Sequence, residues 1–370
     1  MMGMTAYRYR IYPDAEQKML FARTFGCCRF LYNQMLADRK KEYEEKKKAI
    51  RRTPAMYKGT YPWLREVDSL ALANVQLHLE SAFRHFFEPG KSQYPRFKSK
   101  KDSRQSYTTN VVNGNIRFVE GKLRLPKAGL VKIRLHRAVP EEGKLKSVTV
   151  SMEPTGKYHV SMLYEIPGHE DQVAGMPMED ARILGMDYSM KELAVFSDGT
   201  RADYPRYFRE AQKKLAREQR RLSHCRKGSR NYEKQKRKVA LCHEKVKNRR
   251  KDYQHKLSRK LAEQYDVIVT EDLDMKGMSQ SLHFGKSVMD NGYGMFCDKL
   301  SYKLKRQGKK LVKVDRNFPS SKKCSVCGRI REELGLNERL YDCECGNHMD
   351  RDVNAAVNIR EEGKRILATA

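Results

Sequence analysis

Apolar residues follow two different spacings along this chain, and each spacing predicts a different kind of element. Residues 5–12 (TAYRYRIY) alternate between polar and apolar or aromatic side chains, which predicts a β-strand. From about residue 14 to 90 the apolar positions recur every three or four residues, which predicts helices broken at Pro54 and Pro62. Asp14 stands where its side chain can cap the first of these helices.

Alternation returns between about residues 106 and 166, where short β-rich runs are separated by turn signals such as Asn113-Gly114. This pattern predicts an antiparallel barrel or sandwich, and the N-terminal strand is a natural partner for it. The helical block would then be an insertion into a β domain. We therefore expect a β domain over 1–13 and 105–167, a helical domain over 14–104, and a polar linker over 168–180.

The remainder of the chain predicts a mixed α/β domain over 181–317 and 347–370, interrupted by a cysteine-rich insertion over 318–346. The expected elements, in chain order, are a strand at 182–187, a turned strand within KELAVFSDGT, a third strand at RADYP (201–205), long helices over 206–260, a buried strand at 266–271, a helix near 289–308, the strand KKLVKVD and a last helix from about Asp350.

The charge of the chain points to a polyanionic partner. There are 76 Lys and Arg against 46 Asp and Glu, a net charge of +30, and residues 206–260 alone hold 22 basic against 5 acidic residues. Such a chain repels itself until an anionic partner neutralises it, and 20 Tyr and 13 Phe could stack on bases. We expect nucleic acid as the partner, contacted by basic side chains that include Arg8, Arg10, Lys98, Arg217, Arg221, Lys238, Arg249 and Arg250.

Neither a membrane span nor a secretory signal is indicated by the sequence. Nowhere do 18 or more apolar residues follow one another, and the segment MMGMTAYR lacks the apolar stretch of a signal peptide. We therefore expect a cytoplasmic, nucleoid-associated protein with no membrane partner.

Three acidic residues stand at the ends of predicted elements. Asp187 follows the apolar run ILGM, Glu271 closes the strand VIVTE, and Asp352 lies at the start of the helix DRDVNAAVNI. Carboxylates so far apart in the chain converge only if the two strands lie side by side, as in a ribonuclease H-like sheet. Convergent carboxylates hold Mg²⁺, and two such ions about 3.5–4 Å apart can activate a water for attack on a phosphodiester.

Other candidates near these acids leave alternatives open. Asp350 is either a metal ligand or a helix cap, whereas Asp272 and Asp274 are interpreted as loop or capping residues. The pairs His224-Cys225 and Cys242-His243 suggest a further metal site, but both lie in the most basic helical stretch, which favours contact with phosphates or solvent.

Four of the nine cysteines form two close pairs, each followed by glycine. Cys324 and Cys327 are separated by two residues, and Cys343 and Cys345 by one. Four thiolates in a compact ribbon favour tetrahedral coordination of one structural Zn²⁺. Because the second pair is unusually close, His348 stays open as a substitute fourth ligand.

The segments that carry these residues resemble the TnpB proteins of bacterial insertion sequences and the related miniature type V CRISPR effectors. They are GMDYSMKELAVFSDG, VIVTEDLDMKGM and NFPSSKKCSVCG…YDCECGNHMDRDVNAAVNI. The resemblance is specific over 185–359, and it extends to the N-terminal half through its order of elements.

This resemblance implies a wedge β-barrel with an inserted helical recognition domain, followed by a RuvC-like nuclease domain that carries the zinc ribbon. It further implies an RNA-guided DNA endonuclease that cuts double-stranded DNA beside a short motif, with Asp187, Glu271 and Asp352 as its Mg²⁺ ligands. The guide RNA would come from the end of the element, and the chain would act as a monomer with that RNA. Three alternatives remain: an RNA-guided repressor that cuts weakly or not at all, an unguided transposase, and a zinc-ribbon RNA-binding protein.

Overall fold

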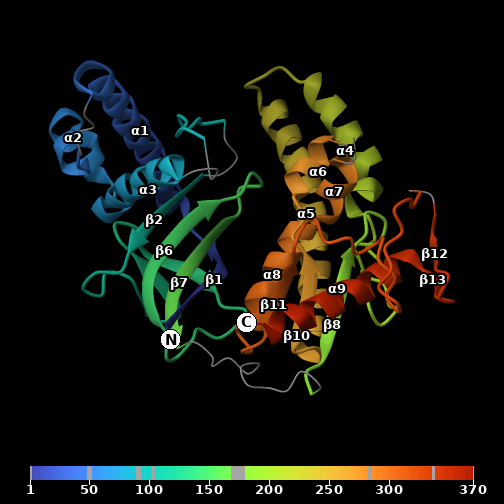
Figure 1. Cartoon of the computed structure of the whole chain (residues 1–370). Coiled ribbons are helices and arrows are strands. Elements are labelled where there is room, and N and C mark those ends of the chain that lie inside the picture. The colour runs from blue at the N-terminus through green and yellow to red at the C-terminus, as the bar shows by residue number, and fades with distance from the viewer. Residues whose placement is uncertain are drawn as a thin grey trace. The chain divides into compact units, whose positions relative to one another are not determined.

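The structure, a computed structural model, describes residues 2–47, 52–88, 93–101, 105–167, 180–281, 285–335 and 338–369. The contacts divide the chain into two compact units, Met1–Pro167 and Gly168–Ala370 (Figure 1). Nearly all of the expected linker at 168–180 lies outside the described residues. Among the helices of the described ranges, none has the length and apolar character needed to cross a membrane.

A seven-stranded antiparallel sheet forms the framework of the first unit, with the strand order β2-β6-β7-β1-β5-β4-β3. Its strands are β1 (Met2–Tyr12), β2 (Gln105–Asn110), β3 (Arg117–Val119), β4 (Lys122–Leu125), β5 (Gly129–Arg134), β6 (Lys144–Met152) and β7 (Tyr158–Pro167). As expected, the N-terminal strand joins the later ones, because β1 pairs along most of its length with β7 and at its end with β5. The described ladders leave β2 and β3 as edge strands.

Helices cover one side of this sheet and share its hydrophobic core. They are α1 (Ala15–Lys46), α2 (Pro54–Thr60), the 3₁₀ helix η1 (Pro62–Glu66) and α3 (Ser69–Phe87). Asp14 caps α1 in a capping box with Gln17. The apolar stripe of α1 faces the sheet, so that Phe21 lies against both Tyr107 of β2 and Tyr158 of β7.

A four-stranded sheet with helices on both faces forms the second unit, in the order β11-β10-β8-β9. The strands are β8 (Ile183–Tyr188), β9 (Ala194–Phe196), β10 (Val267–Glu271) and β11 (Lys310–Val314); β10 runs parallel to β8 and β11, and β9 runs antiparallel to β8. On one face, α5 (Arg230–Gln264) and α8 (Tyr293–Lys305) bury Leu261, Phe296 and Leu300 against the sheet. On the other face lies α9 (Arg351–Ala368).

The prediction of a third strand at 201–205 is wrong. This segment makes one isolated bridge, between Arg201 and Val195, and then leaves the sheet. Pro205 has no backbone N–H to offer a ladder, and Tyr204 turns into the core, where its hydroxyl donates to the backbone oxygen of Asp290 at 2.7 Å. The side chain of Tyr204 therefore anchors the start of the following helix and does not extend the sheet.

The remaining described elements of the second unit are α4 (Tyr207–Ser223), α6 (Met275–Ser281), α7 (Gly285–Asn291), β12 (Leu340–Asp342) and β13 (His348–Asp350). Two glycines bring α9 unusually close to the sheet. A Cβ at Gly185 of β8 would lie 2.0 Å from the backbone oxygen of Ala356, and one at Gly363 of α9 would lie 2.3 Å from Val269. Helix α9 can lie this close to the sheet only because both positions lack a side chain.

Candidate active site and metal centre

The three predicted acids come from three elements that meet on one sheet. Asp187 is near the carboxyl end of β8, and Glu271 is the last residue of the adjacent parallel strand β10. Parallel neighbours end at the same edge, so both carboxylates lie there. Asp352 is in the first turn of α9, which packs on β8 and β10.

The electrostatics indicate that Asp187 lies within range of the charges of the other two acids, although in the described residues the oxygens of the three carboxylates do not all lie within 4.8 Å of one another. Burial raises the pKa of Asp187 well above its usual range, and the charges of Glu271 and Asp352 raise it further. Burial also raises the pKa of Glu271, which accepts a hydrogen bond from Ser320 Oγ at 2.5 Å. Burial, together with the charge of Asp350, raises the pKa of Asp352. A buried acid whose ionisation two further acids oppose lies in a place that a cation would stabilise.

The structure assigns different positions to the two candidates for the third ligand. Asp350 is the N-cap of α9: its Oδ1 accepts from the backbone N–H groups of Asp352 at 3.0 Å and Val353 at 3.1 Å. Its Oδ2 pairs with Arg201 at 2.7 Å. Asp350 is therefore committed to the helix end, and Asp352 is the acid whose charge acts on Asp187.

Arg201 is a residue of this region that sequence reasoning missed. It follows β9, and its guanidinium bridges Glu192 at 2.8 Å and Asp350 at 2.7 Å. The bridge ties the turn after β8 to the first turn of α9, and thereby links the segments that hold Asp187 and Asp352. A single arginine in a polar turn carries no spacing signal from which this position could have been predicted.

The neighbouring acids behave as loop and capping residues, as expected. Asp272 pairs with Lys313 at 2.7 Å and with Arg316 at 3.9 Å. Asp274 accepts from the backbone N–H groups of Lys276 and Gly277 at the start of α6.

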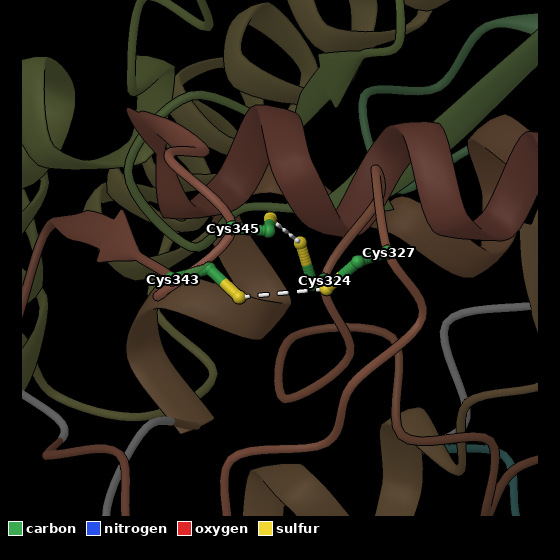
Figure 2. Close-up of side chains that lie close together, drawn as sticks. All are labelled: Cys324, Cys327, Cys343 and Cys345. Atoms are coloured by element: carbon green, nitrogen blue, oxygen red, sulfur yellow. Dashed lines mark hydrogen bonds between the residues drawn. The ribbon is translucent and has the colours of Figure 1, made fainter.

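The four predicted zinc ligands gather at the tips of two turns (Figure 2). Within the described part of the chain, Cys324, Cys327, Cys343 and Cys345 are the group of three or more potential ligands whose ligand atoms all lie within 4.8 Å of one another. The sulfurs of Cys324 and Cys345 are 3.6 Å apart, as are those of Cys327 and Cys343. Zinc with four sulfurs at 2.3 Å would have sulfurs about 3.8 Å apart. The geometry therefore fits one zinc ion.

Each turn is shaped by a glycine in the left-handed region. Gly328 has φ +77° and donates to the backbone oxygen of Cys324, and Gly346 has φ +88° and donates to that of Cys343. Burial acts to raise the pKa of Cys324, but backbone N–H groups of Cys327 and Val326 hold that pKa at about 6. Thiolate, the form that binds metal, is thus favoured there.

His348 is not a fourth ligand. Its ring Nδ1 contacts Asp342 Oδ1, across the hairpin of β12 and β13, and it lies outside the group of four sulfurs. The alternative left open by the close spacing of Cys343 and Cys345 is therefore set aside.

Two asparagines of α9 hold the first cysteine turn to this helix. Asn354 and Asn358 are four residues apart on the buried face of the helix, and both donate to the backbone oxygen of Lys323, at 2.7 and 2.6 Å. Asn354 also accepts from the backbone N–H of Ser325 at 3.0 Å. The cysteine turns are thereby tied to α9, whose first turn holds Asp352.

The basic residues of the second unit line a groove between α4 and α5. The groove has a volume of about 600 Å³, and its apolar floor includes Ala211, Leu241 and Val246. The predicted contact residues on its walls are Arg217, Arg221, Lys238 and Arg249. Arg250 differs from them, because its side chain is 17% exposed and lies 3.8 Å from the buried Asp290. Arg250 is thus occupied inside the unit.

The predicted contact residues of the first unit are partly engaged as well. Arg8 pairs with Glu153 at 2.5 Å, and the guanidinium of Arg10 lies over the ring of Tyr12. The ammonium of Lys98 lies 3.9 Å from the ring centre of Tyr32. No sequence of bases is identified by these contacts.

Comparison with known proteins agrees with the motifs. Three family profiles match: a "Probable transposase" profile (OrfB_IS605) over residues 166–282, a "Cas12f1-like, TNB domain" profile over 293–359, and a "Helix-turn-helix domain" profile over 1–48. Residues 2–46 nevertheless form the strand β1 and the single helix α1.

A protein of Streptomyces pristinaespiralis named "Putative RNA-guided DNA endonuclease" is 37% identical over 97% of this chain and 89% of its own length. The chain belongs to the TnpB family. A second member, InsQ of Escherichia coli K12, bears the same descriptive name and is 30% identical over the whole chain and 94% of its own. A solved Cas12f1–sgRNA–target DNA complex shares the fold, with a TM-score of 0.63 at 15% identity over 97% of this chain and 99% of that one.

Proposed function

We propose that this TnpB-family chain is an RNA-guided, Mg²⁺-dependent endonuclease that cuts double-stranded DNA beside a short recognition motif. The observation that supports the proposal is that Asp187 and Glu271 lie at the carboxyl ends of neighbouring parallel strands, with the charges of Glu271 and Asp352 acting on Asp187. The names of the two full-length relatives, and the fold shared with a guide RNA and target DNA complex, support the same function.

In this proposal the three carboxylates hold two Mg²⁺ ions, which would activate water and stabilise the leaving oxygen of the phosphodiester. The chain's own contribution is to fix the acids. Parallel pairing aligns Asp187 with Glu271, Ser320 orients Glu271 through its hydroxyl, and the capped and zinc-braced α9 holds Asp352 in place. Oxygen ligands suit Mg²⁺, and their raised pKa values are typical of a site built for cations.

The domain assignment follows the same proposal. The β domain of 1–13 and 105–167 would be the wedge barrel, and 14–104 the recognition domain. Residues 181–317 and 347–370 would be the RuvC-like nuclease domain, with the zinc ribbon at 318–346. The basic groove between α4 and α5 would contact the backbone of the guide–target duplex, where base pairing supplies the specificity.

Site-directed variants test the assignment of the acids. Asp187→Asn, Glu271→Gln and Asp352→Asn should each retain bound RNA and lose Mg²⁺-dependent cleavage of a plasmid that carries the target. Asp272→Asn is the matched control, because Asp272 follows Glu271 directly and its described ion pairs are with Lys313 of β11 and with Arg316. Cleavage by Asp187→Asn at the parental rate would refute the assignment.

A further inference from the structure

An exposed group of aromatic side chains lies in the first unit, where α3 ends. Phe87 is 70% exposed, and Tyr94, in the segment 93–101, is 42% exposed. Phe86 joins them, with its ring centre 5.1 Å from that of Phe87 and 5.3 Å from that of Tyr94. We call Phe86, Phe87 and Tyr94 the aromatic shelf.

The shelf is anchored on the buried core. Phe83, which is 5% exposed, stacks on Phe87 with ring centres 6.4 Å apart and meets Tyr94 edge-on at 5.6 Å. The guanidinium of Arg39, on α1, lies 3.8 Å from the ring centre of Phe83. The rings are therefore held in place before any partner arrives, so a partner that stacks on them loses little side-chain freedom on the protein side.

The segment that carries Tyr94 is strongly basic. Residues 93–101 read QYPRFKSKK, with four cations and no acid, and Phe97 among them is 59% exposed. Asn33 of α1 holds the backbone of Lys98 from both sides, accepting from its N–H at 2.7 Å and donating to its oxygen at 2.9 Å. The backbone of this basic segment is thus fixed at Lys98, and its four cations follow Tyr94 within seven residues.

This combination suits one kind of partner. Protein interfaces are depleted in lysine, so the three lysines of this segment do not favour a protein partner. Duplex DNA or RNA offers phosphates, but its bases are already stacked on one another. Unpaired bases offer free faces to aromatic rings, while the backbone between them offers phosphates to cations.

We propose that the aromatic shelf stacks unpaired bases of a single-stranded nucleic acid whose backbone runs along Arg96–Lys101. The site goes beyond the proposed nuclease function, because it uses residues of the first unit alone and does not depend on DNA cleavage. A displaced DNA strand and an unpaired stretch of RNA share this chemistry, and binding to each can be measured separately.

The test uses the full-length chain in a buffer without Mg²⁺, so that no Mg²⁺-dependent cleavage occurs and zinc stays bound, and two labelled probes of equal charge. One is a 12-nucleotide oligo(dT), the other a 12-unit abasic strand. Phe87→Ala should weaken oligo(dT) binding about 5- to 150-fold, since stacking contributes about 1–3 kcal/mol per base. Binding of the abasic strand should change less than about twofold. An oligo(U) probe run in parallel shows whether RNA is accepted as well as DNA.

A cation variant separates stacking from charge. Lys100→Gln should weaken both probes equally and lower the slope of log affinity against log salt by about 0.7, whereas Phe87→Ala should leave that slope unchanged. Phe87→Trp should restore oligo(dT) binding. The matched control is Tyr43→Ala: Tyr43 is an aromatic residue of α1, 57% exposed and with Lys47 over its ring, that lies outside the shelf.

Localisation completes the test, since a chain of charge +30 binds single strands at other places too. An oligonucleotide containing 5-bromouracil should photo-crosslink to peptides that contain Phe87 or Tyr94. Equal loss of affinity for both probes in Phe87→Ala, no loss for either, or crosslinks confined to other peptides would overturn the proposal. The proposal would also be overturned, in favour of a protein contact, if Phe87→Ala bound oligo(dT) like the parent chain but lost self-association in sedimentation.

Discussion

Replacing Gly185 with alanine should disturb the candidate active site without touching any of its acids. The new Cβ would lie 2.0 Å from the backbone oxygen of Ala356 and 2.8 Å from the backbone nitrogen of Arg360. Ordinary contact begins at 3.4 Å, so α9 would have to move away from β8 by about 1.4 Å. Backbone atoms of a helix cannot rotate aside as a long side chain would.

Two effects follow from this displacement. Overpacking of this kind costs about 1–3 kcal/mol of folding free energy, and each kcal/mol lowers the melting temperature of a unit this size by about 2–4 °C. Asp352 lies one turn before Ala356 on α9, so it moves with the helix away from Asp187. A displacement of about 1 Å in a catalytic constellation can cost about 100-fold in rate.

The assay combines thermal unfolding with single-turnover cleavage of a guided target. Gly185→Ala should lower both the melting temperature and the rate. Gly363→Ala, 2.3 Å from Val269 but at the far end of α9 from Asp352, should lower stability with a much smaller effect on rate. Gly3→Ala is the control, since a Cβ there would be 3.9 Å from its nearest neighbour. Parental stability and rate in Gly185→Ala would refute the argument from close packing.

Three further predictions concern contacts that hold the second unit together. Hydrogen bonds from Arg182 lower the pKa of Asp266 to about 2. The ionised Asp266 therefore adds about 1 kcal/mol, after screening, to the free energy of unfolding; this stabilisation is complete above pH 3.8 and is lost as the pH falls through 2. In urea unfolding, the difference in stability between the parent and Asp266→Asn should be smaller at pH 3 than at pH 7. Asn354→Ala leaves backbone groups of Lys323 and Ser325 without this partner, so zinc should pass faster to a chelator and stability should fall by about 1–3 kcal/mol; an unchanged release rate would contradict the bracing role. Arg201→Ala should slow cleavage and lower the melting temperature, and Arg201→Lys should restore less than half of either loss because a lysine cannot bridge two carboxylates in the same plane.

Local patterns predicted the acids and the cysteines, because each of these residues sits at a recognisable place in a periodic segment. Asp187 and Glu271 end apolar strands, and a strand end on a parallel sheet has a defined position. The four cysteines were predicted from spacing alone, and spacing fixes how two turns can present four sulfurs.

Features that depend on contacts between distant segments could not be predicted in this way. Which of Asp350 and Asp352 caps α9 depends on the helix start to one residue, which periodicity does not give. The role of Arg201 depends on its contact with Asp350, 149 positions further along the chain. A third strand was predicted at 201–205, but the side chain of Tyr204 is buried and donates a hydrogen bond to the backbone oxygen of Asp290.

The central claim, that this chain works with a guide RNA, is tested most directly by the RNA that accompanies the protein. The full-length chain should be expressed together with the DNA that flanks its gene, purified, and its bound RNA sequenced. A single abundant RNA that ends at the boundary of the element, and that directs Mg²⁺-dependent cutting of a matching DNA, is the result expected here. Heterogeneous cellular RNA, or no RNA at all, would contradict the claim.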